Sequence, residues 1–144
     1  MIKNNYNYGM NINIEEYNSV AAFLPGLYKF QEDGMFFQAM MGASDKALLI
    51  YNDHAPDNKT ADVVSYKVKV RIPYESIYAI VNERIINNND MSGLSRLHIM
   101  LDKKDTGIFF YYFLEDKKPL KFFLAILKQN GFPAQNRKVD LAKE

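Results

Sequence analysis

The chain has 144 residues, of which 48% are hydrophobic, 24% charged and 14% aromatic, and this composition fits one compact domain with a buried core. Lysine and arginine number 18 against 17 aspartates and glutamates, a formal charge of +1, which argues against a dedicated nucleic-acid-binding protein. Cysteine is absent, so disulfides, thiolate metal sites and cysteine nucleophiles are excluded, and a reducing cytoplasm suits the chain.

The first 26 residues are expected to form an extension that ends in a short helix. Asn13 and Glu16 have the spacing of a capping pair at a helix start. Pro25-Gly26 then marks the end of the helix. Between them, four residues follow the helical spacing: Tyr17, Val20, Ala21 and Leu24.

Membrane insertion is not expected from either the start of the chain or its apolar runs. Residues Met1 to Asn13 lack the apolar stretch of a secretory signal. The longest strongly apolar run, Ile108 to Leu114, is far shorter than the ~20 residues of a membrane-spanning helix. We therefore expect a soluble protein.

From residue 27 onward, apolar segments of strand length alternate with turn residues. The Asp33-Gly34 pair marks the first hairpin. Short strands without alternating helices indicate an antiparallel sheet that curls on itself, because parallel strands need crossover helices. Seven strands are expected, over Leu27–Gln31, Met35–Met41, Lys46–Asn52, Val63–Ile72, Ser76–Ile86, Leu94–Asp102 and Ile108–Leu114.

A helix is expected over Lys117–Asn130, followed by Gly131 as a left-handed cap and Pro133 as a stop. One amphipathic helix of this kind can plug the open end of a small curled sheet. Residues 134–144 mix charges and are expected to form a flexible tail. The expected organisation is therefore an extension over residues 1–26, one domain over 27–133 and a tail over 134–144.

Two short sequence motifs resemble segments of bacterial pleckstrin-homology-like (PH-like) domains. They are Ala43 to Ile50, a small polar residue, an aspartate and a lysine before an apolar strand, and Ile72 to Ile77, Ile-Pro-Tyr-Glu-Ser-Ile. The chain is similar to this family over about Leu27 to Phe132. The resemblance implies a mainly β fold with flanking helices: a seven-stranded antiparallel barrel or sandwich capped by a C-terminal α-helix, here with an added short N-terminal helix.

The resemblance does not imply a phosphoinositide site in this chain. In PH domains that bind these lipids, lysines and arginines of the first hairpin and its second strand hold the phosphates. Here that hairpin carries Glu32 and Asp33 at its turn and no basic residue on the strand that follows. Other proteins with the fold bind peptides, proteins or themselves, so the fold alone does not choose a partner.

No motif in the sequence points to catalysis. His54 and His98 lie in different elements without a partner at metal-ligand spacing, and His98 is expected at the surface. Phosphate loops, serine nucleophile elbows and zinc motifs are absent from the sequence. We expect no enzyme, no cofactor and no metal; a catalytic function would require a deep pocket with polar groups converging near His98.

One strand carries a row of cations. Lys67, Lys69 and Arg71 alternate with apolar residues, so the three cations share one face. Each cation contributes about 1 kcal/mol near an anionic leaflet. Weak attachment to an anionic membrane is one explanation, and a solvated strand face is the other.

Apolar residues also exceed what one core needs. The strand Ile108 to Leu114 is apolar or aromatic on both faces, and Met35 to Met41 is similarly dense in methionine and phenylalanine. Either the N-terminal helix covers this surplus or another chain does. The candidate protein-interface residues are Phe109, Tyr111, Phe113, Phe122 and Ile126.

The sequence therefore predicts a non-catalytic binding or assembly module in a bacterial cytoplasm. Its main expected mechanism is contact with a protein partner, or with a second copy in a homo-oligomer, through an aromatic and methionine-rich surface. The alternative is peripheral attachment to the inner face of a membrane through Lys67, Lys69 and Arg71.

Overall fold

The computed structural model describes residues 11–32, 34–52, 55–56, 63–102 and 106–143. This part of the chain is mainly β, with one α-helix, α1 (Lys117–Gln129), and four 3-10 turns: η1 (Tyr17–Ser19), η2 (Tyr74–Ser76), η3 (Asn89–Met91) and η4 (Leu141–Lys143). The strands are β1 (Asn11–Ile14), β2 (Val20–Phe30), β3 (Phe37–Ser44), β4 (Ala47–Asn52), β5 (Ala55–Pro56), β6 (Val63–Tyr66), β7 (Val68–Pro73), β8 (Ala79–Ile86), β9 (Leu94–Met100), β10 (Gly107–Phe113) and β11 (Gln135–Asp140).

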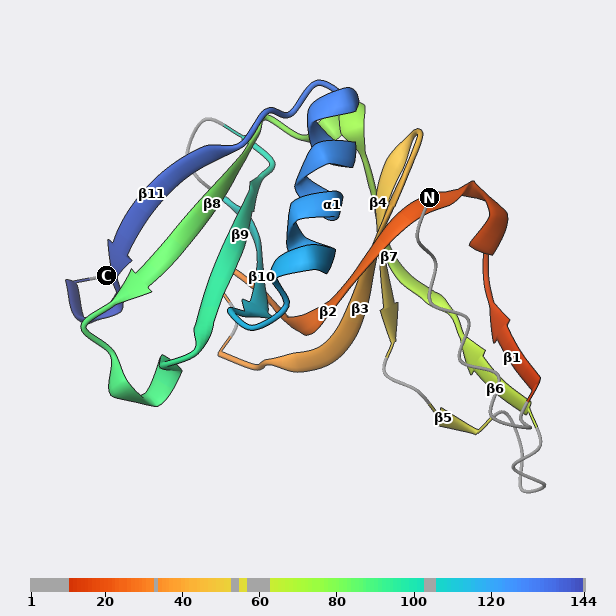
Figure 1. Ribbon diagram of the computed structural model, residues 1–144, viewed down its shortest axis with the longest axis horizontal. Helices are drawn as coiled ribbons and strands as arrows, with labels where there is room; N and C mark the ends of the chain where they lie inside the picture. The colour runs from red at the N-terminus through yellow and green to blue at the C-terminus, as the bar shows by residue number, and fades with distance from the viewer. Residues whose placement is uncertain (1–10, 33, 53–54, 57–62, 103–105, 144) are drawn as a thin grey trace.

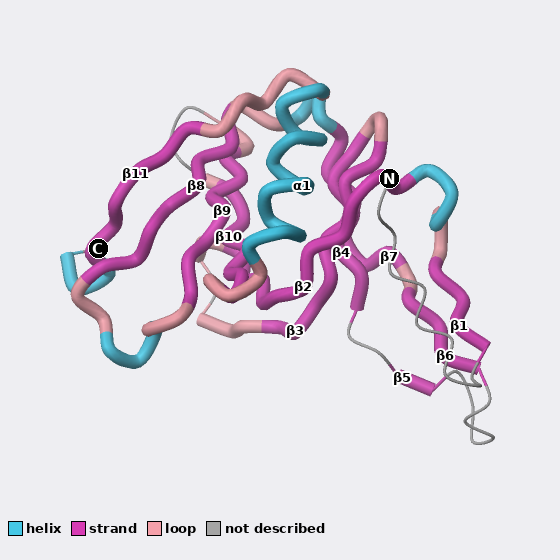
Figure 2. Tube along the Cα trace, viewed as in Figure 1, coloured by secondary structure: helices cyan, strands magenta, loops and turns pink. Residues whose placement is uncertain are grey.

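Eight of these strands form one large sheet in the order β11-β8-β9-β10-β2-β3-β4-β7. Neighbours are antiparallel, except that β11 runs parallel to β8. A small second sheet has the order β1-β6-β5. The large sheet curves around α1, with β8 and β9 on one side of the helix and β4 and β7 on the other (Figures 1 and 2).

Helix α1 seals the inner face of the large sheet. Its buried residues Phe123, Ile126 and Leu127 join a core built from β2, β3, β4 and β7 to β10, and Leu120 packs against that core. The predicted cap is confirmed, because Gly131 has φ +96° and the Phe132 amide donates to the Leu127 carbonyl at 2.9 Å. No helix in the described ranges is long and apolar enough to span a membrane.

The predicted N-terminal helix is wrong. Residues 11–30 form β1, the short turn η1 and the long strand β2. Burial along β2 alternates with period two, so Ala22 and Leu24 point inward from a strand. Val20, which precedes a bulge in this strand, packs in a second apolar cluster with Leu49 and Tyr51. β2 continues through Pro25-Gly26, which the prediction treated as a stop. The proline is tolerated because β10 pairs with β2 only from Leu27 onward.

The described residues form eleven strands and not the seven predicted, and three further elements differ from their predicted form. The expected flexible tail contains β11, which adds to the edge of β8 and buries Val139. The expected strand over residues 63–72 is two strands in different sheets, β6 and β7, because Lys67 turns aside and its amide donates to Asn52 Oδ1. The expected strand over 76–86 begins later, at β8, after η2.

The two motifs that carry the family resemblance, Ala43 to Ile50 and Ile72 to Ile77, lie side by side. Ala47 pairs with Pro73, and Tyr74 donates its hydroxyl to the Ser44 carbonyl at 2.7 Å. Burial of that hydroxyl raises the pKa of Tyr74 to about 12, so it remains a proton donor at neutral pH. Ile72 and Ile77 on either side are buried. These two motifs therefore hold β4 and β7 together at one end of the sheet.

We predict that Gly26→Ala destabilises the fold by about 3 kcal/mol, because a Cβ at this position would lie 1.9 Å from the Tyr111 carbonyl oxygen of β10. Gly34→Ala is the matched control, since a Cβ there meets nothing within 4 Å. Urea denaturation followed by circular dichroism measures both. Equal free energies of unfolding for the two variants would contradict the close approach of β2 and β10.

Candidate functional site

The outer face of the large sheet, opposite α1, carries a row of polar side chains on four adjacent strands. The pairing register places Glu83 of β8 opposite Arg96 of β9, and Arg96 opposite Tyr111 of β10. β11 brings Arg137 beside Glu83. Because paired residues of neighbouring strands point to the same face, these four side chains meet.

Glu83 and Arg96 form a buried ion pair within this row. Their side chains are 0% and 2% exposed, and Arg96 Nε donates to Glu83 Oε1 at 2.7 Å. Arg96 Nη1 also donates to the Tyr111 hydroxyl at 3.1 Å. The second carboxylate oxygen accepts from Arg137, through Nε at 2.8 Å and through Nη2. Both oxygens of Glu83 are thus engaged by arginines on the two flanking strands.

The cluster keeps Glu83 ionised. Burial alone would raise the pKa of this carboxyl group, but the neighbouring His98 and the hydrogen bonds from Arg137 and Arg96 outweigh burial and lower its pKa to about 2. At neutral pH the group is therefore a carboxylate that accepts hydrogen bonds. It does not act as a proton donor.

His98 belongs to the same cluster, and the prediction that it lies at the surface is wrong. The residue is 3% exposed, its Nδ1 lies 3.7 Å from Glu83 Oε2 and 3.4 Å from Arg137 Nη2, and its ring packs on Phe109 with centroids 4.6 Å apart. His98 is buried because β11, which the sequence analysis treated as a loose tail, carries Arg137 against this face.

A pocket of about 730 Å³ lies over this face, and we name it the outer pocket; residues of β2, β8 to β11 and η4 line it, together with Gln31 and Phe36. Its aromatic residues are Phe36, Phe109 and Tyr111. Tyr111 lies 5.3 Å from Phe36 and 6.3 Å from Phe109 between ring centroids. Its charged residues are the cations Lys29, Arg96, Arg137, Lys138 and Lys143 and the carboxylates Glu83 and Asp140.

The five predicted interface residues do not share one surface. Phe109 and Tyr111 line the outer pocket but are themselves buried, at 6% and 2% exposure. Phe122 and Ile126 lie on α1 and pack toward the core on the opposite side of the sheet. Phe113, at the end of β10, is 41% exposed. The structure thus separates the helix residues from the strand residues.

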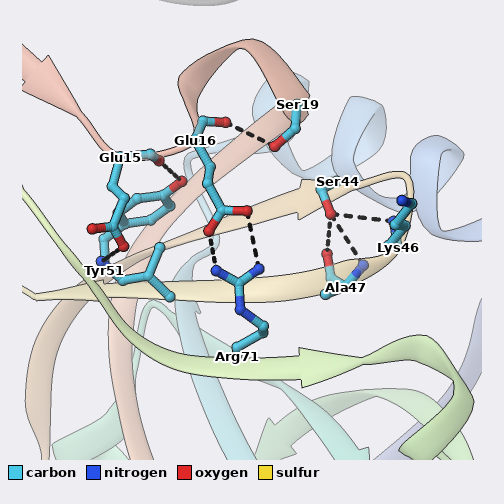
Figure 3. Close-up of polar contacts among 9 residues, drawn as sticks. Glu15, Glu16, Ser19, Ser44, Lys46, Ala47, Tyr51 and Arg71 are labelled. Carbon is cyan, nitrogen blue, oxygen red and sulfur yellow. Dashed lines mark hydrogen bonds and ion pairs between the residues drawn. The ribbon is translucent and has the colours of Figure 1, made fainter.

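The three predicted cations are exposed, but only Lys69 and Arg71 lie on β7, because Lys67 falls between β6 and β7. Lys69 Nζ lies 5.0 Å from the centre of the Phe37 ring. Arg71 forms a two-point ion pair with Glu16, next to η1 (Figure 3). Hydrogen bonding to Arg71 lowers the pKa of Glu16, so the pair stays charged. Lys67 and Lys69 remain as cations without an ion pair to any described residue.

The outer pocket brings charged, polar and aromatic side chains together on one face of the sheet. Polar groups do converge near His98, as a catalytic function would require. Among the described residues that line it there is no serine, threonine or cysteine, and Glu83 is held by two arginines. The described residues also contain no group of three or more potential metal ligands. His54 lies outside the described residues.

Sequence reasoning missed Glu83 and Arg137 and did not assign Arg96 to a site. Arg96 shares a strand face with His98, and that alternation was visible. Glu83 sits 13 residues before Arg96 and 54 before Arg137, and only the strand register brings the three together. The missing information was the position of β11.

We predict that Glu83→Gln destabilises the protein by roughly 3–5 kcal/mol at pH 7, because Arg96 is left buried without a carboxylate.

The wild type should lose stability as the pH falls from about 4.5 to 2, since the folded state holds the Glu83 pKa below its unfolded value. Urea denaturation at several pH values measures both effects.

Glu75→Gln is the control for this experiment, because Glu75 is exposed on η2. It should retain the stability of the wild type at pH 7 and the same acid dependence. If Glu83→Gln lost stability between pH 4.5 and 2 as steeply as Glu75→Gln, Glu83 would not be the titrating group.

Comparison with known proteins gives a likeness in structure only. No protein-family model and no curated protein sequence matches the chain. A solved structure of autoinhibited Vav1 matches 81% of this chain with a TM-score of 0.52 and 18% sequence identity, over 20% of the Vav1 chain. Vav1 contains a PH domain. At this identity the match shows the fold alone, and it supports a PH-like fold for this chain.

Proposed function

We propose that the chain is a non-catalytic PH-like binding module that contacts a protein partner through the outer pocket. The PH-like fold supports a binding module in general. The proposed contact site lies on the face of the sheet that α1 leaves uncovered. A second copy of the chain is one partner that fits the proposal, and a different protein is the other.

The observation that carries the proposal is the aromatic row Phe36, Tyr111 and Phe109 beneath arginines and lysines. Tyrosine, phenylalanine, methionine and arginine are the residues that interfaces enrich, and buried aromatic residues with arginine dominate binding energies. Phe109 and Tyr111 form the floor of the pocket, while Phe36 and Met35 at its edge are 46% and 60% exposed. A partner that covers this edge removes apolar area from water.

The proposed contact surface includes some of the five predicted interface residues and excludes others. Phe109 and Tyr111 stay in the site as the buried floor of the pocket, and the contact itself is made at its exposed edge. Phe122 and Ile126 are left out, because they pack toward the core. Met35 and Phe36 from the β2–β3 connection take their place.

Photo-cross-linking tests this contact. Benzoylphenylalanine in place of Phe36 should give one discrete adduct in cells that express the full chain, of dimer size for self-association or of another size for a different partner. The same replacement at Tyr78, which is 56% exposed outside the pocket, is the control and should give none. Equal, diffuse cross-linking at both positions would contradict the proposal.

Attachment to anionic membranes through β7 is the second candidate function. Lys69 is exposed on β7, Lys67 is exposed directly before it, and Arg71 is held by Glu16. Two exposed cations contribute about 2 kcal/mol near an anionic leaflet, which gives weak binding. Glu16→Gln releases the third cation.

If this second function holds, Glu16→Gln should sediment more strongly than the wild type with phosphatidylserine vesicles at low salt, by up to about fivefold. Glu75→Gln, with the same change in net charge, is the control. Equal sedimentation of all three proteins with acidic and with neutral vesicles would exclude attachment through β7.

A further inference from the structure

We infer that the partner inserts into the outer pocket an acidic side chain next to an aromatic or branched apolar one. This inference rests on the proposed function and assigns the chemistry of the group that the pocket receives. Three properties of the pocket support it: the sign of its charge, the engagement of its carboxylates, and the arrangement of its aromatic floor.

The pocket carries five cations against two carboxylates. Two of the cations, Lys138 and Lys143, are exposed and form no ion pair with any described residue. Arg137 uses Nε and Nη2 for Glu83, and its side chain is 46% exposed. The cations that face the opening are therefore accessible to an incoming group, and a positive potential in a concave site attracts anions.

Both carboxylates of the pocket already accept hydrogen bonds from the protein. The two oxygens of Glu83 accept from Arg96 and Arg137. Asp140 accepts from the Asn87 side chain and from the Ala142 amide. A cationic ligand would have to compete with these donors in the field of the lysines. An anionic ligand meets no such competition.

Cations of the pocket lie directly against its aromatic rings. Lys29 Nζ is 5.7 Å from the centre of the Phe109 ring and 6.0 Å from that of Phe36, and the Arg96 guanidinium lies 3.8 Å over Phe109. Val139 of β11 and Leu141 of η4 also line the pocket. A ligand that fits has an apolar side chain for the exposed Phe36 ring at the pocket edge and a carboxylate for the cationic rim.

The pocket has the size for such a pair of side chains. A volume of about 730 Å³ lies within the range of sites for small ligands, which is about 300–1,000 Å³. A single carboxylate or phosphate ion would leave the ring of Phe36, which is 46% exposed, in contact with water. The aromatic part of the ligand is therefore expected to contribute to affinity beyond the anion.

Two dipeptides that differ only in charge test the inference. Acetyl-phenylalanyl-glutamate amide and acetyl-phenylalanyl-glutamine amide are titrated into the full ¹⁵N-labelled chain, and amide chemical shifts are followed by NMR. The glutamate peptide should shift resonances of β8 to β11 and bind about threefold to fivefold more tightly than the glutamine peptide. Added salt should reduce this preference.

A double substitution of the rim identifies the cations involved. Lys138→Gln with Lys143→Gln should remove the preference for the glutamate peptide without unfolding the chain, since neither lysine has an ion-pair partner among the described residues. Lys117→Gln with Lys118→Gln is the control, because both residues are exposed on α1 away from the pocket. It carries the same change in net charge and should keep the preference.

Several results would overturn the inference. Equal affinity for the two dipeptides would do so, as would binding of inorganic phosphate alone as tightly as the glutamate peptide. If neither dipeptide binds while position 36 still cross-links to one partner, the acidic group is wrong and the proposed contact stands. If cross-linking is also absent, the proposed function fails with it.

Discussion

A carboxylate held between two arginines organises the outer half of this protein. Glu83 is completely buried and accepts hydrogen bonds from Arg96 on one neighbouring strand and from Arg137 on the other. Removing one member of such a cluster leaves an uncompensated buried charge, which is far more costly than the cluster is stabilising. The arrangement therefore fixes β11 against β8, and with β11 it fixes one wall of the outer pocket.

The two faces of the large sheet have different roles. Helix α1 covers the inner face and completes the core, as a sealing helix should. The outer face carries polar and aromatic residues and the pocket near β8 to β11, and a second buried apolar cluster that includes Leu49 and Tyr51 of β4. A PH-like fold does not determine what is bound, because function depends on the side chains that the fold displays. In this chain the side chains proposed to bind a partner lie on β8 to β11 and on the β2–β3 connection.

The sequence predicted the elements whose signals are local. Helix α1 was found within one residue of its observed end, because its apolar period and the Gly131 cap agree. The strands β3, β4, β9 and β10 were found for similar reasons. The start of β2 was mistaken for a helix, since Val20 and Leu24 fit both a period of 3.6 and a period of two. Only pairing with β3 decides between them.

The candidate site was harder to predict, because it depends on contacts that are distant in sequence. Phe109 and Tyr111 were identified from an apolar surplus, and their neighbours in the pocket were not. Arg137 lies in a charged segment of low apolar content, which locally resembles a loose terminus. It is ordered by one ion pair and by the buried side chain of Val139, both of which require β8 to be in place.

The position of β11 has a consequence for how copies of the chain can meet. The large sheet ends at β11 on one side and at β7 on the other. Both terminal strands carry exposed cations: Arg137 and Lys138 on β11, Lys69 and Arg71 on β7. Like charges along unpaired strand edges oppose the joining of two sheets into one continuous ribbon. Addition of another copy's strand at either edge of the sheet is therefore disfavoured.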